Sequence, residues 1–249
     1  MLALASDFDR TLFFHDQDNF YYRKEDIEAR KQFQTAGNLF GVCTGRSYSG
    51  IVNCNFHQIA YDFYIVCSGA KILDRHGHII YQKFIDKSLA KKIYDHFDHV
   101  DTSIVYQDKM YIMNRLEKLP ERLIPISSFD QVGDEFEAFS MHFSNSAEAK
   151  IHYQMIIDEF GDVIDVYQNE RHLDFATKGC SKGNGIAWLI NYFNLLKENM
   201  AVIGDSWNDI TMLQSVDNSF TFNRSPEEVK EIANYLVDGI DECIAKLGK

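Results

Sequence analysis

The chain has 249 residues, of which 45% are hydrophobic and 25% charged, and its 25 Lys and Arg against 37 Asp and Glu give a formal net charge of −12. This composition excludes a disordered chain, and only 3 Pro and 14 Gly exclude a collagen-like or low-complexity one. The acidic excess argues against nonspecific binding to nucleic acid or an anionic membrane, and no apolar stretch approaches the ~20 residues of a membrane span.

Short apolar runs alternate with helix-like stretches in the first third of the chain. We predict strands over residues 1–5, 39–43 and 63–67, and a surface helix over residues 24–36 that ends at Gly37-Asn38. Strands that alternate with helices are typical of a doubly wound, mainly parallel α/β sheet.

The middle of the chain has a different pattern, which indicates an α+β unit. Phe139, Met141 and Phe143 alternate with polar residues, as in a sheet with one exposed face. The predicted strands are residues 78–85, 102–106, 110–114, 138–143 and 163–168, with helices at 87–97 and 147–160 and a hairpin turn at 107–109.

The last third returns to the first pattern. Ser181 is placed to cap a helix whose apolar residues, such as Ile186 and Leu189, recur at helical spacing. A strand follows at 200–203, a capping box at Ser225 opens a helix to about Tyr235, and a final helix spans 240–247.

The length exceeds a usual domain of ~150 residues, which favours either two domains or one core with a large insertion, and the change of pattern in the middle supports the insertion. We therefore expect a Rossmann-like core made of residues 1–76 and 173–249, interrupted by an inserted α/β cap at residues 77–172.

The first motif is Asp7-Phe8-Asp9-Arg10-Thr11, directly after the first predicted strand. Ligands of open α/β sheets bind at the carboxyl ends of the strands, so Asp7 and Asp9 would point into that crevice. Two close carboxylates favour a hard divalent cation between them, whereas the alternative is a solvated pair in a turn.

Two further strand or helix ends carry groups suited to a phosphate. Thr44-Gly45-Arg46 ends a strand, so its backbone N–H groups and the Thr44 hydroxyl could hold a phosphate oxygen. Lys182 lies in the first turn of a helix, where the macrodipole disfavours a cation unless an anion or a carboxylate lies nearby. The alternatives are an ordinary capped turn and a surface lysine.

The fourth motif follows the predicted strand at 200–203. Gly204 permits close approach of the backbone, Asp205 could complete a magnesium site, and Asp209 could support it from one turn further on. A helix-capping turn is the alternative. Together the four motifs suit phosphoryl transfer through a nucleophilic carboxylate with magnesium and a lysine.

These ordered motifs resemble those of the haloacid dehalogenase superfamily, mostly magnesium-dependent phosphatases, and the insertion resembles the cap of its Cof-like subfamily. The resemblance implies that Asp7 is the nucleophile and that Asp9 is the general acid and later the base. It implies Mg²⁺ ligation by Asp7, Asp205, the backbone carbonyl of Asp9 and, directly or through water, Asp209. It also implies phosphate binding by Thr44, Gly45, Lys182 and Asn208, with Arg46 as a possible substrate contact.

The chain departs from the family pattern at two places. Relatives usually carry Gly where this chain has Arg10, and often Asn where it has Ser68. Arg10 could contact an anion of the substrate, but we favour an orientation towards solvent. Among the histidines, His96 and His99 could bind zinc weakly, but a solvated helix end is the favoured interpretation.

The expected function is hydrolysis of a small phosphorylated metabolite, with a sugar phosphate favoured. The alternatives are a sugar phosphomutase of the same superfamily and a non-enzymatic phospho-receiver or magnesium-binding module. No P-loop motif supports a kinase or ATPase. Five scattered Cys without a Cys-x-x-Cys pair and the absence of a signal-like start lead us to expect a cytoplasmic protein, while the oligomeric state stays open.

Overall fold

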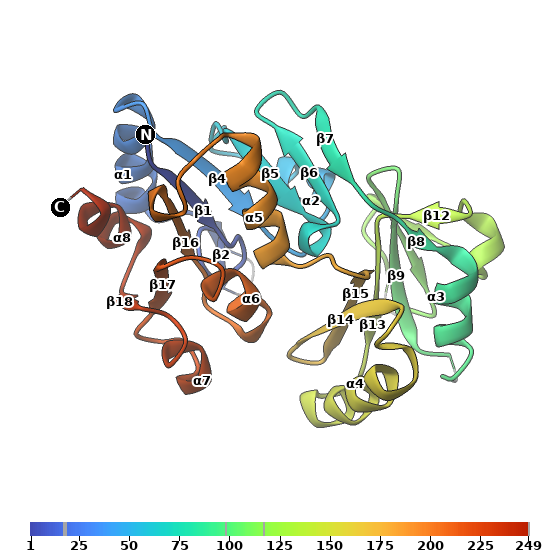
Figure 1. Cartoon of the computed structure of the whole chain (residues 1–249). Helices are drawn as coiled ribbons and strands as arrows, with labels where there is room; N and C mark the ends of the chain where they lie inside the picture. The colour runs from blue at the N-terminus through green and yellow to red at the C-terminus, as the bar shows by residue number, and fades with distance from the viewer. Residues whose placement is uncertain (17–18, 98, 117, 249) are drawn as a thin grey trace.

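The computed structural model describes residues 1–16, 19–97, 99–116 and 118–248, which form two main sheets (Figure 1). The larger sheet has eight strands in the order β18-β17-β16-β1-β4-β5-β6-β7. Its strands are β1 (Ala3–Ser6), β4 (Leu39–Cys43), β5 (Phe63–Val66), β6 (Lys71–Asp74), β7 (Ile79–Gln82), β16 (Met200–Ile203), β17 (Asn218–Phe222) and β18 (Tyr235–Val237). The strands from β18 to β5 run parallel, and β6 and β7 run antiparallel at one edge.

The two ends of the chain complete this sheet together. Strand β1 lies between β4 and β16, and Ser6 is in register with both Val42 and Ile203. Because these strands are parallel and in register, the residues that follow each of them emerge at one edge of the sheet.

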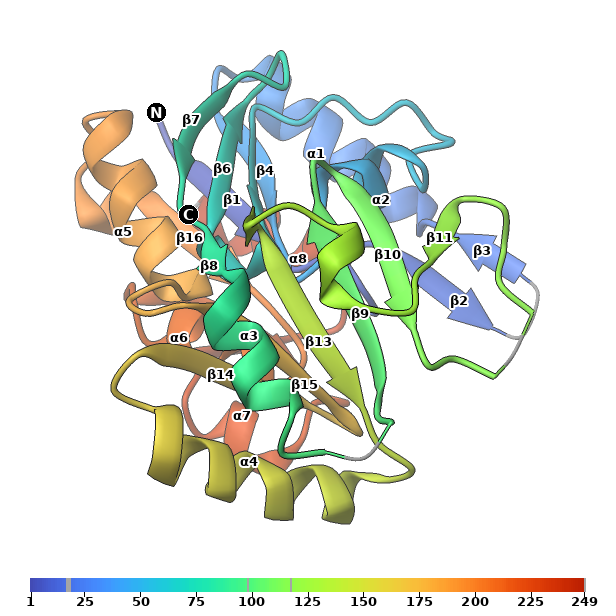
Figure 2. The ribbon, with the colours of Figure 1, turned by 90° about the vertical axis from the view of Figure 1, so that its right-hand side faces the viewer.

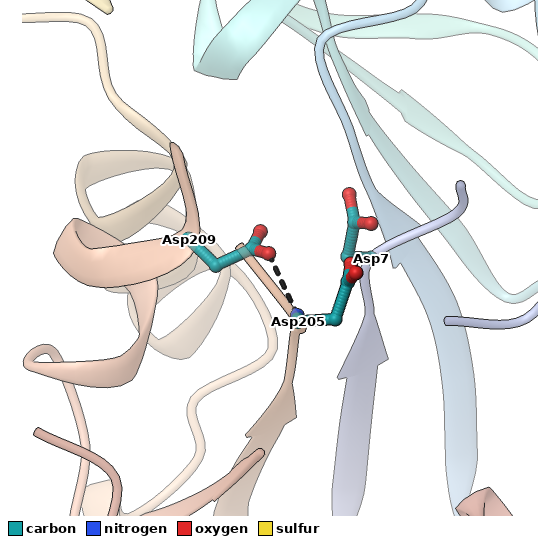
Figure 3. A group of neighbouring side chains, drawn as sticks. All are labelled: Asp7, Asp205 and Asp209. Carbon is teal, nitrogen blue, oxygen red and sulfur yellow. Dashed lines mark hydrogen bonds between the residues drawn. The ribbon is translucent and has the colours of Figure 1, made fainter. Parts of the chain in front are cut away.

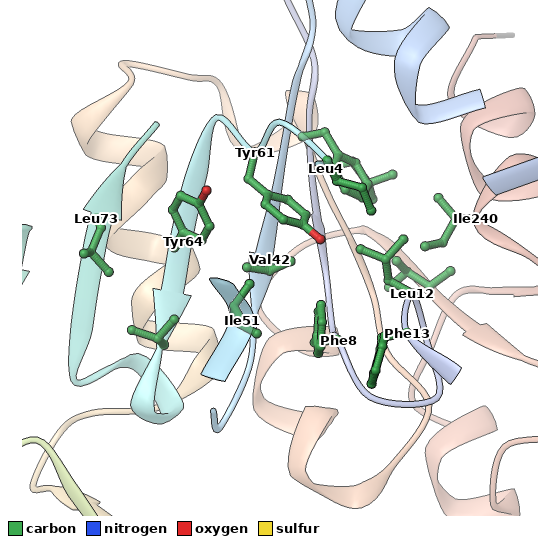
Figure 4. Close-up of a cluster of buried hydrophobic side chains, with 14 of the residues drawn as sticks. Leu4, Phe8, Leu12, Phe13, Val42, Ile51, Tyr61, Tyr64, Leu73 and Ile240 are labelled. Atoms are coloured by element: carbon green, nitrogen blue, oxygen red, sulfur yellow. The ribbon is translucent and has the colours of Figure 1, made fainter. Parts of the chain in front are cut away.

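Helices cover both faces of the larger sheet. One face packs against α1 (Lys24–Thr35) and α8 (Ile240–Leu247), and Figure 4 shows part of its apolar layer, including Leu4, Phe8 and Ile240. The other face packs against α5 (Lys182–Tyr192) and α6 (Ile210–Leu213). Burial on both faces explains why β1, β4, β5 and β16 are continuous apolar runs.

The second sheet has six strands in the order β11-β10-β9-β13-β15-β14. They are β9 (Asp101–Tyr106), β10 (Lys109–Met113), β11 (Leu123–Pro125), β13 (Ala138–His142), β14 (Ile164–Asn169) and β15 (His172–Thr177). Helices α3 (Lys87–Tyr94) and α4 (Ser146–Phe160) cover the face turned away from the larger sheet, as Figure 2 shows. Phe139 and Met141 pack there, which confirms the alternation expected for residues 138–143.

The remaining elements are short. Two small sheets pair β2 (Phe14–Asp16) with β3 (Asn19–Tyr21) and β8 (Ile85–Asp86) with β12 (Glu135–Phe136). Single helical turns or short helices occur at α2 (Tyr48–Val52), α7 (Glu227–Lys230), η1 (Cys67–Gly69), η2 (Phe129–Gln131), η3 (Lys197–Asn199) and η4 (Trp207–Asp209). No helix of the described residues is long and apolar enough to cross a membrane.

Some predicted elements were wrong, and pairing explains the differences. The predicted strand 78–85 is divided, because β7 pairs with β6 in the larger sheet and β8 pairs with β12. The helix predicted from Ser225 to about Tyr235 is the short α7, since Tyr235 already belongs to β18, which pairs with β17. Strand β7 belongs to the larger sheet and β15 to the second sheet.

Candidate active site

Three aspartates from the two ends of the chain meet at the carboxyl edge of the larger sheet (Figure 3). Asp7 follows β1, and its N–H donates to the carbonyl of Ile203 at 2.8 Å. Asp205 follows β16, and Asp209 Oδ2 accepts from the Asp205 N–H at 2.9 Å. One carboxylate oxygen from each of Asp7, Asp205 and Asp209 lies within 4.8 Å of the others.

Lys182 is buried between two of these carboxylates. It is 2% exposed, and its Nζ lies 2.7 Å from Asp7 Oδ1 and 2.6 Å from Asp209 Oδ1. Ser181 caps α5 by accepting from the Asn184 N–H at 3.0 Å, as the sequence predicts. A lysine in the first turn of a helix needs a negative charge nearby, and Asp7 and Asp209 provide it. The alternative that Lys182 is a surface lysine is therefore wrong.

The site carries more negative than positive charge. Burial raises the pKa of Asp7, and the charges of Asp209 and Asp205 raise it further against the opposing effect of Lys182. Burial and Asp209 raise the pKa of Asp205 to about 6. Burial lowers the pKa of Lys182, but Asp209 and Asp7 outweigh this effect and raise it overall.

This donor set fits a hard divalent cation. Asp209 uses both oxygens, Oδ1 with Lys182 and Oδ2 with the N–H groups of Asp205 and Ser206. Asp7 Oδ2 and Asp205 Oδ2 make no hydrogen bond to other described residues, so they are free to bind a cation that would offset the excess charge.

Asp9 is held by Arg46. The guanidinium donates from Nε to Asp9 Oδ2 at 2.7 Å and from Nη2 to Oδ1 at 2.6 Å, and it lies over the rings of Phe8 and Phe13. The bidentate pair fixes the direction of both side chains. Arg46, which the sequence indicates only as a possible substrate contact, thus contacts the expected general acid.

The predicted phosphate-binding residues lie around the same opening. Thr44 is buried, and its hydroxyl accepts from the Arg46 N–H at 3.2 Å. Asn208 Oδ1 is buried and has no hydrogen-bond partner among the described residues. Ser68 adopts a left-handed backbone with φ 53°, a conformation that suits Asn as well, and its N–H donates to the Thr44 carbonyl at 3.1 Å.

A cavity of about 540 Å³ joins these residues to the second sheet. Asp7, Asp9, Thr44, Gly45, Arg46, Asp205 and Asn208 line one side of it. The other side is lined by Ser103, Ser140, His142, His172 and Asp174 of the second sheet, by Arg115 just after β10, and by the apolar Met110 of β10. The site therefore lies between the two sheets and has a polar wall on each side.

Arg10 is exposed and forms an ion pair at the surface. Its Nη1 lies 2.8 Å from Glu170 Oε1 in the turn between β14 and β15, although the two side chains are 59% and 50% exposed. Arg10 is thus exposed, as expected, and its ion pair with Glu170 lies at the rim of the cavity.

The second-sheet residues that line the cavity, and the contact of Thr11 with Asp205, were not predicted from the sequence. Thr11 belongs to the first motif but was given no role there, and its hydroxyl donates to Asp205 Oδ1 at 3.1 Å. Ser140 and His142 alternate with Phe139 and Met141, and this alternation was the available signal for a polar face. His96, for which zinc binding was the less favoured interpretation, lies 3.2 Å from Glu159 Oε1 through Nε2 and packs against Phe160.

Comparison with known proteins identifies the family. Residues 4–246 match the family model of haloacid dehalogenase-like hydrolases. Phosphatase YwpJ of Bacillus subtilis is 23% identical over 281 residues, covering 97% of this chain and 96% of that protein. Kanosamine-6-phosphate phosphatase of the same organism is 32% identical over 92 residues, covering 35% of this chain and 31% of that protein.

Solved structures support the same assignment of the fold. The structure of the subclass IIB sugar phosphatase BT4131 superposes with a TM-score of 0.80 and 20% sequence identity, covering 97% of this chain and 95% of that one. This agreement confirms the predicted α/β fold. The chain therefore belongs to the haloacid dehalogenase-like hydrolases.

Proposed function

We propose that the protein is a magnesium-dependent phosphatase that hydrolyses a sugar phosphate through an aspartyl-phosphate on Asp7. The observation that carries this proposal is the position of Asp7, which Lys182 holds at 2.7 Å at the base of a polar cavity. A buried carboxylate that is oriented by a cation and open to a cavity is suited to nucleophilic attack.

In the first step, Asp7 attacks the phosphorus and the bond from phosphorus to the ester oxygen breaks. Asp9 gives its proton to the departing oxygen, for which it must exchange its contact with Arg46 for one with the substrate. Thr44, Gly45, Asn208 and Lys182 hold the phosphoryl oxygens. In the second step, Asp9 takes a proton from water, which attacks the phosphorus and releases Asp7 and inorganic phosphate.

Asp7, Asp205 and the backbone carbonyl of Asp9 are the proposed Mg²⁺ ligands, with Asp209 as their support. When bound, Mg²⁺ neutralises negative charge on the phosphoryl group and on the carboxylates around it. The oxygen-only donor set and the excess of negative charge support magnesium over softer metals.

The division into a core and an inserted cap at residues 77–172 remains part of the proposal. The cap would cover the leaving group, exclude water and select the substrate. The lining of the cavity by residues of β9, β13 and β15 supports this role.

A sugar phosphate is supported by the polar second wall and by two relatives, the kanosamine-6-phosphate phosphatase and the sugar phosphatase described above. Hydroxyl, imidazole and carboxylate groups pair well with the hydroxyls of a sugar. An apolar leaving group would offer these polar groups no hydrogen-bond partner.

The test is turnover by an Asp7→Asn variant. With Mg²⁺ and p-nitrophenyl phosphate, we expect Asp7→Asn to lower kcat by roughly 10³-fold or more while its circular dichroism spectrum stays that of the wild type. Asp217→Asn, an exposed carboxylate, is the matched control and should retain full activity. Substantial turnover by Asp7→Asn would contradict the proposed nucleophile, and a single turnover by the wild type would contradict hydrolysis.

A further inference from the structure

A second cavity, of about 740 Å³, lies between the edge of the larger sheet and the hairpin of β9 and β10. Lys71 of β6 and Gln82 of β7 line it on one side, and Tyr106, Asp108 and Glu137 line it on the other. Among the described residues, none lines both this cavity and the one at Asp7. The cavity is large enough for a small molecule, and the proposed reaction gives it no role.

Lys71 is a buried cation that two carboxylates of this cavity share. Its Nζ donates to Asp108 Oδ2 at 2.8 Å and lies 3.5 Å from Glu137 Oε1, and the side chains of Lys71 and Glu137 are 3% and 4% exposed. Burial lowers the pKa of Lys71, but Asp108 and Glu137 outweigh this effect and raise it overall, so the ammonium group is charged at neutral pH. One positive charge therefore serves two carboxylates.

The second oxygen of each carboxylate has no partner. Glu137 Oε2 and Asp108 Oδ1 are buried and make no hydrogen bond within the part of the chain that the structure describes. Gln82 Nε2 donates to Glu137 at Oε1, at 3.4 Å, and so does not satisfy Oε2. A buried carboxylate oxygen without a donor is costly, so these two oxygens indicate that a cationic donor is missing from the cavity.

Carboxylates outnumber cations around the whole cavity. Two of the carboxylates have partners outside it, because Asp134 Oδ1 lies 2.8 Å from Lys87 Nζ and Asp86 Oδ1 accepts from N–H groups at the start of α3. The others exceed the single charge of Lys71, the basic residue among the described residues that line the cavity. The carboxylates of the lining are Asp86, Asp108, Asp134, Glu135 and Glu137.

An organic ammonium group fits this cavity better than a metal ion. Among the described residues, the three aspartates at Asp7 form the only group of three or more potential metal-binding side chains whose ligand atoms lie within 4.8 Å of one another. The carboxylates of the second cavity are therefore too dispersed to enclose a metal ion. Phe84 and Tyr106 add aromatic rings to the lining, and such rings attract ammonium groups and pack against alkyl chains.

We propose that this cavity binds a small organic diamine or polyamine, with one ammonium group beside Glu137 and Asp108 and the alkyl chain against Phe84 and Tyr106. The ammonium group supplies the donors that the two unpaired oxygens lack and a charge that offsets the excess of carboxylates. The bound amine would join the edge of the larger sheet to the β9–β10 hairpin. This inference concerns a different cavity from that of the proposed reaction and does not depend on it.

The test is a calorimetric titration of the whole chain with spermidine, in a buffer of physiological ionic strength that contains Mg²⁺. The Mg²⁺ is included to occupy the aspartates at Asp7, and the salt screens weak attraction to the acidic surface. We expect saturable binding of one spermidine per chain. Putrescine should bind as well, whereas the uncharged diol of the same chain length should not. The absence of saturable binding by both amines, or equal binding by the diol, would overturn the proposal.

Two variants test the carboxylates themselves. Glu137→Gln and Asp108→Asn should each weaken the binding of spermidine by at least about 10-fold, because a hydrogen bond to a charged group is lost. Asn suits the backbone of Asp108, which has φ 58°, so Asp108→Asn keeps the test valid if Glu137→Gln does not fold. Asp217→Asn, an exposed carboxylate outside the cavity, is the matched control and should bind spermidine as the wild type does.

Two further results would contradict the assignment. Equal affinity for spermidine in the wild type and in the folded cavity variants would mean that the amine binds to the acidic surface in general. A titration with Mg²⁺ alone whose heat is lost in Asp108→Asn would mean that the cavity binds a metal ion rather than an amine.

Discussion

Asp26 is a buried carboxylate that has no place in the proposed reaction. It lies in the first turn of α1, its Oδ1 accepts from the Asp241 N–H of α8 at 3.0 Å, and its Oδ2 has no hydrogen-bond partner among the described residues. Burial raises its pKa to about 6, and the Asp241 carboxylate adds to the shift against the opposing effects of Arg23 and the Asp241 N–H. The group therefore binds its proton more tightly in the folded chain than in the unfolded one.

This shift predicts a dependence of stability on pH. The contribution of a carboxyl group with a raised pKa is complete below about pH 4, the unfolded value, and is lost as the pH rises through about 6. Asp26→Asn removes this loss, so at pH 8 it should raise the free energy of unfolding by about 1–3 kcal/mol relative to the wild type. The gain should shrink at pH 5, as measured by urea denaturation at both pH values.

The exposed neighbour provides the control for this prediction. Glu25→Gln removes a charge from the same turn of α1 without burial, so its stability should follow the pH dependence of the wild type. If Asp26→Asn also follows the wild type between pH 5 and pH 8, the burial of Asp26 does not control its ionisation.

At the scale of secondary-structure elements, a close contact between η1 and the start of α5 positions Lys182. Gly69 in η1 has φ +91°, and a Cβ there would lie 2.2 Å from the carbonyl oxygen of Ser181, the cap of α5. Only a residue without a side chain allows the two segments to approach this closely. The approach places Lys182 beside Asp7.

Gly69→Ala should therefore both destabilise the fold and lower activity. We expect a loss of about 1–3 kcal/mol in the free energy of unfolding from the forced displacement, and a reduced kcat because Lys182 moves with α5. Urea denaturation and turnover of p-nitrophenyl phosphate measure the two effects.

Gly37→Ala is the matched control for Gly69→Ala. Gly37 has φ +86°, but a Cβ there has no atom within 4 Å, so its substitution introduces backbone strain without a clash. Gly37→Ala should lose less stability than Gly69→Ala and keep its activity. Equal losses in both variants would show that backbone strain, rather than contact with Ser181, accounts for the need for glycine.

The periodicity of apolar residues predicted those helices and strands whose burial is uniform along their length. The buried strands β1, β4 and β16 and the amphipathic α3 were recognised from periodicity, because burial on two faces or on one face leaves a distinct pattern. Strand β18 was not predicted, and its first residue, Tyr235, was expected to end a helix, because β18 is an edge strand of three residues whose pairing with β17 depends on a distant segment. A capping signal shows where a helix begins but not how far it extends.

At the scale of the whole molecule, metal binding should stabilise the fold. Asp7 and Asp205 come from opposite ends of the chain, so a cation held between them joins the two segments of the larger sheet. A ligand at 100 times its Kd stabilises the folded state by about 2.7 kcal/mol, and Mg²⁺ should therefore raise the Tm of the wild type.

Two variants distinguish Mg²⁺ binding at the aspartate site from a general effect of Mg²⁺ on a protein with a net charge of −12. Asp205→Asn should lose most of the increase in Tm with Mg²⁺, because one proposed ligand is missing. Asp217→Asn changes the net charge by the same amount at an exposed position and should keep the increase. Equal increases in both variants would mean that Mg²⁺ acts by screening and not at this site.

The sequence by itself determined which reactive residues the site contains and that they lie together at one edge of the larger sheet. The four strand-end and helix-end motifs contain Asp7, Thr44, Lys182 and Asp205, and parallel pairing brings the ends of neighbouring strands to one edge whatever the details of packing. The resemblance of these motifs to a known superfamily is confirmed by the family match over residues 4–246.

Only the tertiary structure shows which residues of the second sheet line the cavity. Ser140, His142, His172 and Asp174 lie in short strands whose alternation shows a polar face but not what that face covers. Arg10 follows β1 and Glu170 lies in the turn between β14 and β15, so no local pattern predicts their contact. Such contacts depend on how two separately packed sheets are placed against each other, and this placement follows from many weak contacts between distant segments rather than from any one motif.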